Sequence, residues 1–151
     1  MKYTLEQISD RLEIEDLITE YADAIDTCEL DRLDQVFTLD AHIDYSAMGG
    51  AVGSYPEVKA FLVQALPAFK NTQHLIANYQ IKLSGATATG KIMCFNPMEF
   101  ESSDAAPLPV FFLGLWYLDE YVKTPEGWRI NKRSEVKSYS YNTPAFLQFD
   151  K

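Results

Sequence analysis

The two hydrophobic periodicities of this chain are separated along its length. From Leu5 to about Asp26, apolar residues recur every three or four positions, which predicts a long helix. Shorter helical patterns cover Asp31–Phe37 and Glu57–Leu66. From residue 73 onward the pattern changes to the alternation typical of strands. Helices first and strands afterwards predict an α+β domain.

Two capping boxes mark helix starts. Thr4 is followed three residues later by Gln7, and Ser54 is followed in the same way by Glu57. The second helix is expected to stop before Pro67, because the residue preceding a proline avoids the helical conformation.

The predicted strands are long and follow one another closely. After a first strand over Ala41–Met48, the expected strands are Gln73–Leu83, Thr87–Phe100, Val110–Tyr121 and Trp128–Tyr141. In the first of these four, one apolar face is expected, made of Leu75, Ala77, Tyr79, Ile81 and Leu83. Val110–Tyr121 is apolar on both faces, which indicates a central strand. Consecutive hairpins make these strands antiparallel, and a curled sheet with three helices across its concave side would enclose a pocket.

Length and charge exclude several classes of protein. A chain of 151 residues with 47% hydrophobic residues is expected to form a single domain over 1–151, ending in an apolar tail from 141 to 151. The net charge of −9 and the lack of clustered Lys and Arg argue against a nucleic-acid binder. No apolar run approaches the roughly 20 residues of a membrane span. The acidic N-terminal segment is unlike a signal peptide, so a cytoplasmic location is expected, with Cys28 and Cys94 as free thiols.

Asp26 and His74 are candidates for an acid–base pair. A carboxylate that holds an imidazole in one tautomer makes the imidazole a usable base near neutral pH. Asp26 borders the apolar stripe of the long helix, and His74 begins a predicted strand. The alternative readings are a solvated helix-end Asp and a solvent-facing His on the more polar strand face. His42, beside Asp44, is interpreted as a surface residue.

Other polar and aromatic residues are candidates for the pocket wall. Arg133 belongs to an alternating set of charged residues, and such a set commonly marks a solvated strand face. If that face turned inward, Arg133 could bind a leaving oxygen, with Glu135 beside it. The residues expected only to line the pocket are Phe69, Phe95, Asn96 and Tyr117. The tail residues Phe146, Leu147 and Phe149 are expected to cover the pocket mouth or a neighbouring subunit.

The chain resembles a known group of proteins in four features. These are the order of its elements, the segment Asp26–Leu33, the motif Ile43-Asp44-Tyr45 and the motif Thr72-Gln73-His74. The chain resembles the SnoaL-like, or nuclear-transport-factor-2-like, cone fold. That group includes scytalone dehydratase, bile acid dehydratase, hexachlorocyclohexane dehydrochlorinase, ketosteroid isomerase and polyketide cyclases. The resemblance covers the chain to about Tyr141.

The resemblance implies site roles. Asp26, Tyr45 and His74 match the pocket aspartate, a catalytic tyrosine and the catalytic histidine of scytalone dehydratase. Tyr21 matches the tyrosine of the bile acid dehydratase pattern. Arg133 matches a pocket arginine of the dehydrochlorinase. The chain departs from scytalone dehydratase at Met98, where that enzyme has a second histidine, and from the dehydrochlorinase at Tyr21, where that enzyme has a lysine.

Together these features predict a cofactor-independent lyase, a dehydratase-type enzyme acting on a small apolar or aromatic molecule, with His74 as base. The alternatives are a polyketide cyclase or ketosteroid-type isomerase, and a non-catalytic ligand-binding or assembly module of the same fold. No metal ligand spacing and no cofactor motif is found in the sequence. The resemblance also implies a homo-oligomer, a trimer rather than a dimer.

Overall fold

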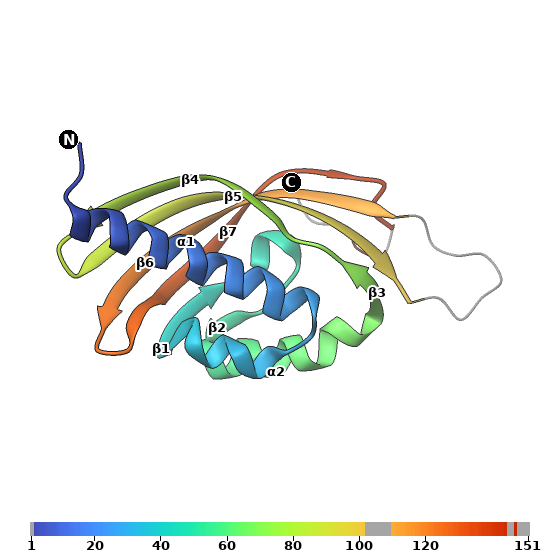
Figure 1. Ribbon diagram of the computed structural model, residues 1–151. Helices are drawn as coiled ribbons and strands as arrows, with labels where there is room; N and C mark the ends of the chain where they lie inside the picture. Colours follow the sequence, from blue (N-terminus) through green and yellow to red (C-terminus); the bar gives the residue numbers. More distant parts are fainter. Residues whose placement is uncertain (1, 102–109, 145–146, 148–151) are drawn as a thin grey trace.

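A computed structural model describes residues 2–101, 110–144 and 147 of the chain. The α-helices are α1 (Leu5–Asp26) and α2 (Tyr55–Ala65), and the 3-10 helices are η1 (Leu30–Gln35), η2 (Ser46–Met48) and η3 (Leu66–Ala68). The strands are β1 (Phe37–Asp44), β2 (Val52–Ser54), β3 (Phe69–Thr72), β4 (Leu75–Ser84), β5 (Thr87–Phe100), β6 (Phe111–Thr124) and β7 (Gly127–Tyr141). The helices lie along one side of a long curled sheet (Figure 1).

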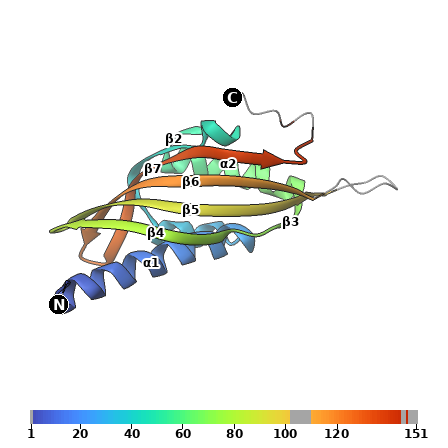
Figure 2. The same cartoon turned by 90° about the horizontal axis from the view of Figure 1, so that it is seen from above.

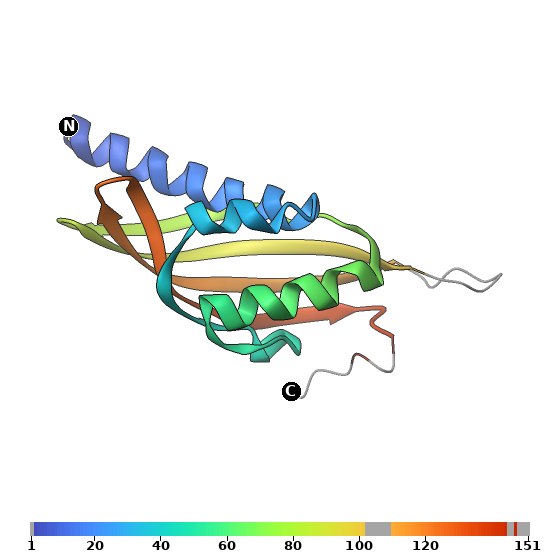
Figure 3. The same cartoon turned by 90° about the horizontal axis from the view of Figure 1, so that it is seen from below.

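The strands form one mostly antiparallel sheet. Its order is β2-β1-β7-β6-β5-β3, and β4 also pairs with β5. Only the β1–β7 pair is parallel among the described strands. Seen from below, η1 and α2 lie across the same face of the sheet as α1 (Figure 3). The α+β class and the curled, mostly antiparallel sheet with three helices are therefore confirmed.

Helix α1 begins at the predicted capping box and buries one face along most of its length. The Thr4 hydroxyl accepts the backbone N–H of Gln7, and the Gln7 side chain accepts the backbone N–H of Thr4. The buried face carries apolar residues from Ile14 to Ile25. Before Ile14 the prediction that the apolar residues of this helix are buried is wrong.

In the first turns of α1 the buried residue is Asp10, while Leu5 and Leu12 are 80% and 57% exposed. Asp10 accepts hydrogen bonds from the Trp128 indole at 3.0 Å and from Lys123 Nζ at 2.7 Å. The helix thus meets the sheet through a polar contact at this end, where its N-terminus leaves the sheet edge near β4 (Figure 2).

The elements between the helices differ from expectation in their bounds. The expected helix over Asp31–Phe37 is a 3-10 helix that ends at Gln35. The strand expected from Ala41 begins at Phe37 and ends at Asp44. The backbone then turns, because the carbonyl of Tyr45 accepts the N–H groups of both Met48 and Gly50.

A β-bulge reverses the inward face of β4. The pairing with β5 shifts register between Ala77 and Gln80, and Asn78 has φ 52°. After the bulge Tyr79, Ile81 and Leu83 pack on the core as expected. Before it the inward residue is Ile76, and Leu75 is 60% exposed, so the single apolar face predicted for this strand is wrong there.

A second bulge reverses the inward face of β7. Tyr121 pairs with Ile130 and Glu120 with Lys132, which leaves Asn131 as the extra residue. The buried residues of β7 are therefore Trp128 and Ile130 before the bulge and Arg133 after it. The charged side chains of this strand reach the concave side because of that shift.

The outer face of the sheet carries exposed apolar side chains in the described part of the chain. Leu118, Val136 and Tyr139 are 39%, 44% and 51% exposed. Leu147 of the tail packs against the core, whereas Phe146 and Phe149 lie outside the described residues. The oligomer, and the role of the tail at a subunit boundary, stay predictions.

Candidate active site

The end of α1 meets the start of β4 through Asp26 and His74. Asp26 Oδ1 lies 2.6 Å from His74 Nδ1, and Asp26 Oδ2 accepts the backbone N–H of His74 at 2.7 Å. The two side chains are 20% and 8% exposed. The carboxylate therefore holds both the ring and the backbone of the histidine, and it favours the tautomer with a proton on Nδ1.

The second ring nitrogen of His74 faces an amide. Asn96 Nδ2 lies 3.1 Å from His74 Nε2, and Asn96 Oδ1 accepts a hydrogen bond from the Thr72 hydroxyl at 3.1 Å. With its oxygen bound to Thr72, the amide presents its N–H group to Nε2. This arrangement favours the tautomer with a lone pair on Nε2, because that nitrogen can then accept from the amide.

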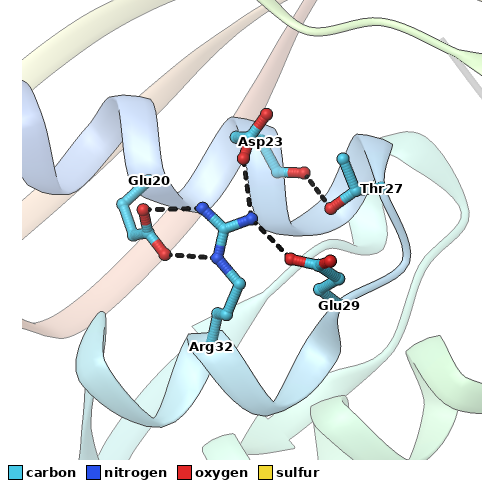
Figure 4. A network of polar contacts seen from close by, with 5 residues as sticks. All are labelled: Glu20, Asp23, Thr27, Glu29 and Arg32. Carbon is cyan, nitrogen blue, oxygen red and sulfur yellow. Dashed lines mark hydrogen bonds and ion pairs between the residues drawn. The ribbon is translucent and has the colours of Figure 1, made fainter.

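Arg32 of η1 holds the last turns of α1, where Asp26 lies (Figure 4). Its guanidinium donates to Glu20 at 2.6 Å, to Asp23 at 2.7 Å and to Glu29 at 2.8 Å. These contacts join the helix to the segment that follows it. They fix the backbone that carries the carboxylate of the site.

His74 lines a cavity of about 140 Å³ between the helices and the concave face of the sheet. A larger hollow of about 470 Å³ lies beside it, lined in part by Asp26. Thr72 and Met98 line both spaces, so the two adjoin each other at these residues. The lining of the inner cavity is mostly apolar and aromatic, and includes Ile25, Leu62, Leu66, Leu113 and Leu115.

Three tyrosines place hydroxyl groups at this cavity. The hydroxyls of Tyr21 and Tyr45 are hydrogen-bonded at 2.9 Å. The ring of Tyr21 meets the rings of Tyr117 and His74 edge-on, with centroids 5.7 and 6.3 Å apart. Burial raises the pKa of all three phenols, so they stay neutral hydrogen-bond donors at physiological pH.

Arg133 is fully buried beneath these tyrosines. Its Nε and Nη2 atoms each donate to Asp119 at 2.7 Å, and Asp119 also accepts the Tyr121 hydroxyl at 2.7 Å. The guanidinium carbon lies 4.1 Å from the Tyr21 ring centre and 4.2 Å from that of Tyr117. Burial opposes the charge, but the pKa of Arg133 is raised overall because Asp119 stabilises the cation.

Arg133 faces inward, yet it is not part of the cavity wall. Its two hydrogen bonds to Asp119 and its stacking against the rings make it a support for the tyrosines. The binding of a leaving oxygen by this arginine stays a prediction.

Glu135, two residues further on β7, does line the cavity. Burial raises the pKa of this carboxyl to about 8, although the nearby Arg133 lowers it and Asp44 and Asp119 raise it. A carboxylic acid with such a pKa is protonated at neutral pH, and perturbed carboxyl groups of this kind are common in active sites.

The structure brings together seven of the ten residues predicted for the site. The wall of the cavity includes Tyr21, Tyr45, His74, Asn96, Tyr117 and Glu135, and Asp26 lies directly behind His74. Arg133 lies beneath the wall, as described. Phe69 instead stacks on Phe100, and Phe95 stacks on Phe112, so neither lines the cavity.

Thr72 and Asp119 contribute to the site but were not predicted from the sequence. Thr72, the last residue of β3, orients Asn96, and its place two residues before His74 was the available signal. Asp119 pairs with Arg133, and only the observed strand register reveals that contact.

Across residues 2–101, 110–144 and 147, no group of three or more His, Cys, Asp or Glu side chains is placed to hold a metal ion. Among the same residues, no helix has the length and apolar character needed to cross a membrane.

Comparison with known proteins agrees with this fold. The model of the SnoaL-like domain matches residues 6–134. An uncharacterized protein of Mycobacterium tuberculosis is 47% identical over 133 residues, which are 88% of each chain. The crystal structure of a protein from Kribbella flavida has a TM-score of 0.79 and 26% identity, over 89% of this chain and 94% of that one.

A type 2 hexachlorocyclohexane dehydrochlorinase (LinA) also has a TM-score of 0.79, with 18% identity and 93% coverage of both chains. Fold and cavity thus define a cone-shaped protein of the nuclear-transport-factor-2-like class. Within that class, this chain belongs to the SnoaL-like family.

Proposed function

We propose that this protein is a cofactor-independent lyase that eliminates water or a similar leaving group from a small apolar or aromatic molecule. The observation that carries the proposal is the contact of Asp26 with His74 at the wall of the cavity. The structurally similar LinA is by its name a dehydrochlorinase, an enzyme that removes hydrogen and chloride, which is an elimination of the same type.

His74 is the base in this proposal. Nε2 takes a proton from a substrate carbon, the electrons of the C–H bond form the new double bond, and the leaving group departs with the electrons of its own bond. Asp26 keeps the ring oriented and stabilises the imidazolium that forms. Positioned proton transfer of this kind contributes about 10²- to 10⁴-fold in rate.

The bond between Asn96 and His74 Nε2 must open for this step. A bound substrate would displace the Asn96 N–H group, which then becomes free to donate to the substrate. The hydroxyls of Tyr21 and Tyr45 are the other donors at the wall, and they would polarise a carbonyl group. Arg133 is a positioning residue in this proposal, because it acts through the rings of Tyr21 and Tyr117, on which it stacks.

The size and lining of the cavity support a small substrate. The space at His74 measures about 140 Å³, which suits a small molecule. The apolar walls favour an uncharged aliphatic or aromatic ring.

Solvent deuterium exchange tests the proposal and separates it from its alternatives. The protein is incubated in D₂O with small cyclic β-hydroxy ketones and with the matching ketones that lack the hydroxyl. Formation of a conjugated enone, detected by absorbance, supports the lyase. Deuterium at the α-carbon without elimination supports an isomerase or cyclase. Binding without exchange or elimination supports a non-catalytic module and contradicts the proposal.

A further inference from the structure

Glu135 is the only carboxyl group on the wall of the His74 cavity among the described residues. It reaches the wall because the bulge at Asn131 turns this part of β7 inward. Within the described part of the chain, no side chain or backbone group is hydrogen-bonded or ion-paired to it. Its two oxygen atoms are therefore available to a bound molecule.

The charges around Glu135 disfavour its ionised form. The nearest cation, Arg133, is already paired with Asp119, whose two carboxylate oxygens take two of its N–H groups. Asp44 at the end of β1 adds a further negative charge. The other titratable groups that face this region are neutral phenols, a buried thiol and the imidazole of the site: Tyr21, Tyr45, Tyr117, Cys94 and His74. An ionised Glu135 would leave this buried cluster with a net negative charge, a costly arrangement.

The position of Glu135 relative to the base follows from the strand register. Glu135 is the direct cross-strand partner of Tyr117. The Tyr21 ring meets both the Tyr117 ring and the His74 ring edge-on. Glu135 and His74 thus lie on the same cavity, separated along its wall by the Tyr21–Tyr117 pair, so one small molecule can contact both.

We propose that Glu135 is the acid of this site: a neutral carboxyl group that donates its proton, or a hydrogen bond, to an oxygen atom of the substrate. The inference rests on the proposed elimination and specifies its substrate class, an uncharged molecule with a hydroxyl or carbonyl oxygen. A cationic substrate would require the ionised carboxylate instead.

The proton balance of the elimination closes with this assignment. His74 takes the proton from carbon, and the C–H electrons form the double bond. The C–O bond breaks toward oxygen, which takes the Glu135 proton and leaves as water. The products are an imidazolium and a carboxylate, and proton exchange with solvent returns both groups to their starting states.

The protonation state of Glu135 is measured without any ligand. Infrared spectra between about pH 6 and about pH 10 follow the C=O band of the protonated carboxyl. In the wild-type protein we expect a band that disappears with a midpoint near pH 8. The band should be absent from Glu135→Gln and retained in Glu126→Gln, a matched change at an exposed turn residue. No such band in the wild type at about pH 6 would overturn the proposal.

Ligand binding tests the donor role directly, with acetophenone as an uncharged probe that has one carbonyl oxygen. Its dissociation constant is measured by calorimetry at about pH 7 and about pH 9.5. We expect the affinity of the wild type to fall about tenfold or more at the higher pH, and that of Glu135→Gln to stay constant. An affinity that does not fall, or no measurable affinity at either pH, would contradict the proposal.

These outcomes are separable from those of the base. An ordinary, ionised Glu135 together with loss of exchange in His74→Ala would remove the acid and keep the proposed base. A protonated Glu135 together with full exchange in His74→Ala would remove the base and keep the neutral carboxyl in the cavity.

Discussion

Asp26 binds His74 at two points, since one carboxylate oxygen lies 2.6 Å from the ring Nδ1 and the other accepts the backbone N–H at 2.7 Å. The pair joins residues that are 48 positions apart in the sequence, at the meeting of α1 and β4. Because both oxygens are used, the carboxylate ties the orientation of the ring to the backbone directly before β4.

Asp26→Asn is expected to lower turnover by about 10²- to 10⁴-fold, because an amide neither stabilises the imidazolium nor enforces the Nδ1–H tautomer. The free energy of unfolding should change much less than the rate, since the amide keeps the size and one acceptor. Steady-state kinetics and urea unfolding of the same preparation measure both. A variant with wild-type turnover would show that the carboxylate has no catalytic role.

Thr72→Val is expected to slow proton abstraction by several-fold without abolishing it. The Thr72 hydroxyl holds the amide oxygen of Asn96, and without it the amide can rotate and present its oxygen to Nε2. That orientation no longer favours the tautomer with a lone pair on Nε2, which the base needs. Thr72→Ser keeps the hydroxyl and should restore the wild-type rate. Equal rates of α-carbon exchange in the Val and Ser variants would contradict this role.

Arg133→Ala is expected to destabilise the protein by about 3–5 kcal/mol, because it leaves the buried Asp119 without its partner. Arg133→Lys should recover only part of the loss, since a point charge cannot replace the two parallel hydrogen bonds and the ring stacking. In urea unfolding, the free energy of unfolding should be highest for the wild type, lower for Arg133→Lys and lowest for Arg133→Ala. Equal stability of the wild type and Arg133→Ala would refute the support role.

The stability of the protein should decline with pH because of Glu135. Its pKa is about 8 in the folded state against an ordinary value of 4.5, so between these values the folded state holds a proton that the unfolded state has lost. The contribution is fully present below about pH 4.5 and is lost as the pH rises to about 8, at up to roughly 1.4 kcal/mol per pH unit. Urea unfolding of Glu135→Gln should lack this decline. The same slope of unfolding free energy against pH in the wild type and in Glu135→Gln would contradict this contribution.

Several features of the fold could be predicted because their causes are local. The capping boxes at Thr4 and Ser54 are confirmed, and so is the central position of the strand after Val110. Asp26 and His74 were singled out from matched short segments, and the structure places them in contact.

The face of the sheet to which each side chain points could not be predicted, because a single extra residue in a β-bulge reverses the alternation. The prediction assumed uninterrupted alternation in β4 and β7, whereas the structure has bulges at Asn78 and Asn131. Leu75 was therefore expected inside, and the facing of Glu135 stayed open. The first turns of α1 show a different cause, since tertiary partners bury the polar Asp10 where the apolar pattern favoured other residues.

The most direct test of the central proposal is α-carbon exchange in D₂O by His74→Ala and by His42→Ala, followed by NMR with the ketones described above. His74 lies on the cavity wall, and His42 is an exposed histidine on β1 that serves as the matched control. We expect exchange by the wild type and by His42→Ala, and a loss of about 10²-fold or more in His74→Ala with the fold retained. Undiminished exchange in His74→Ala would contradict it.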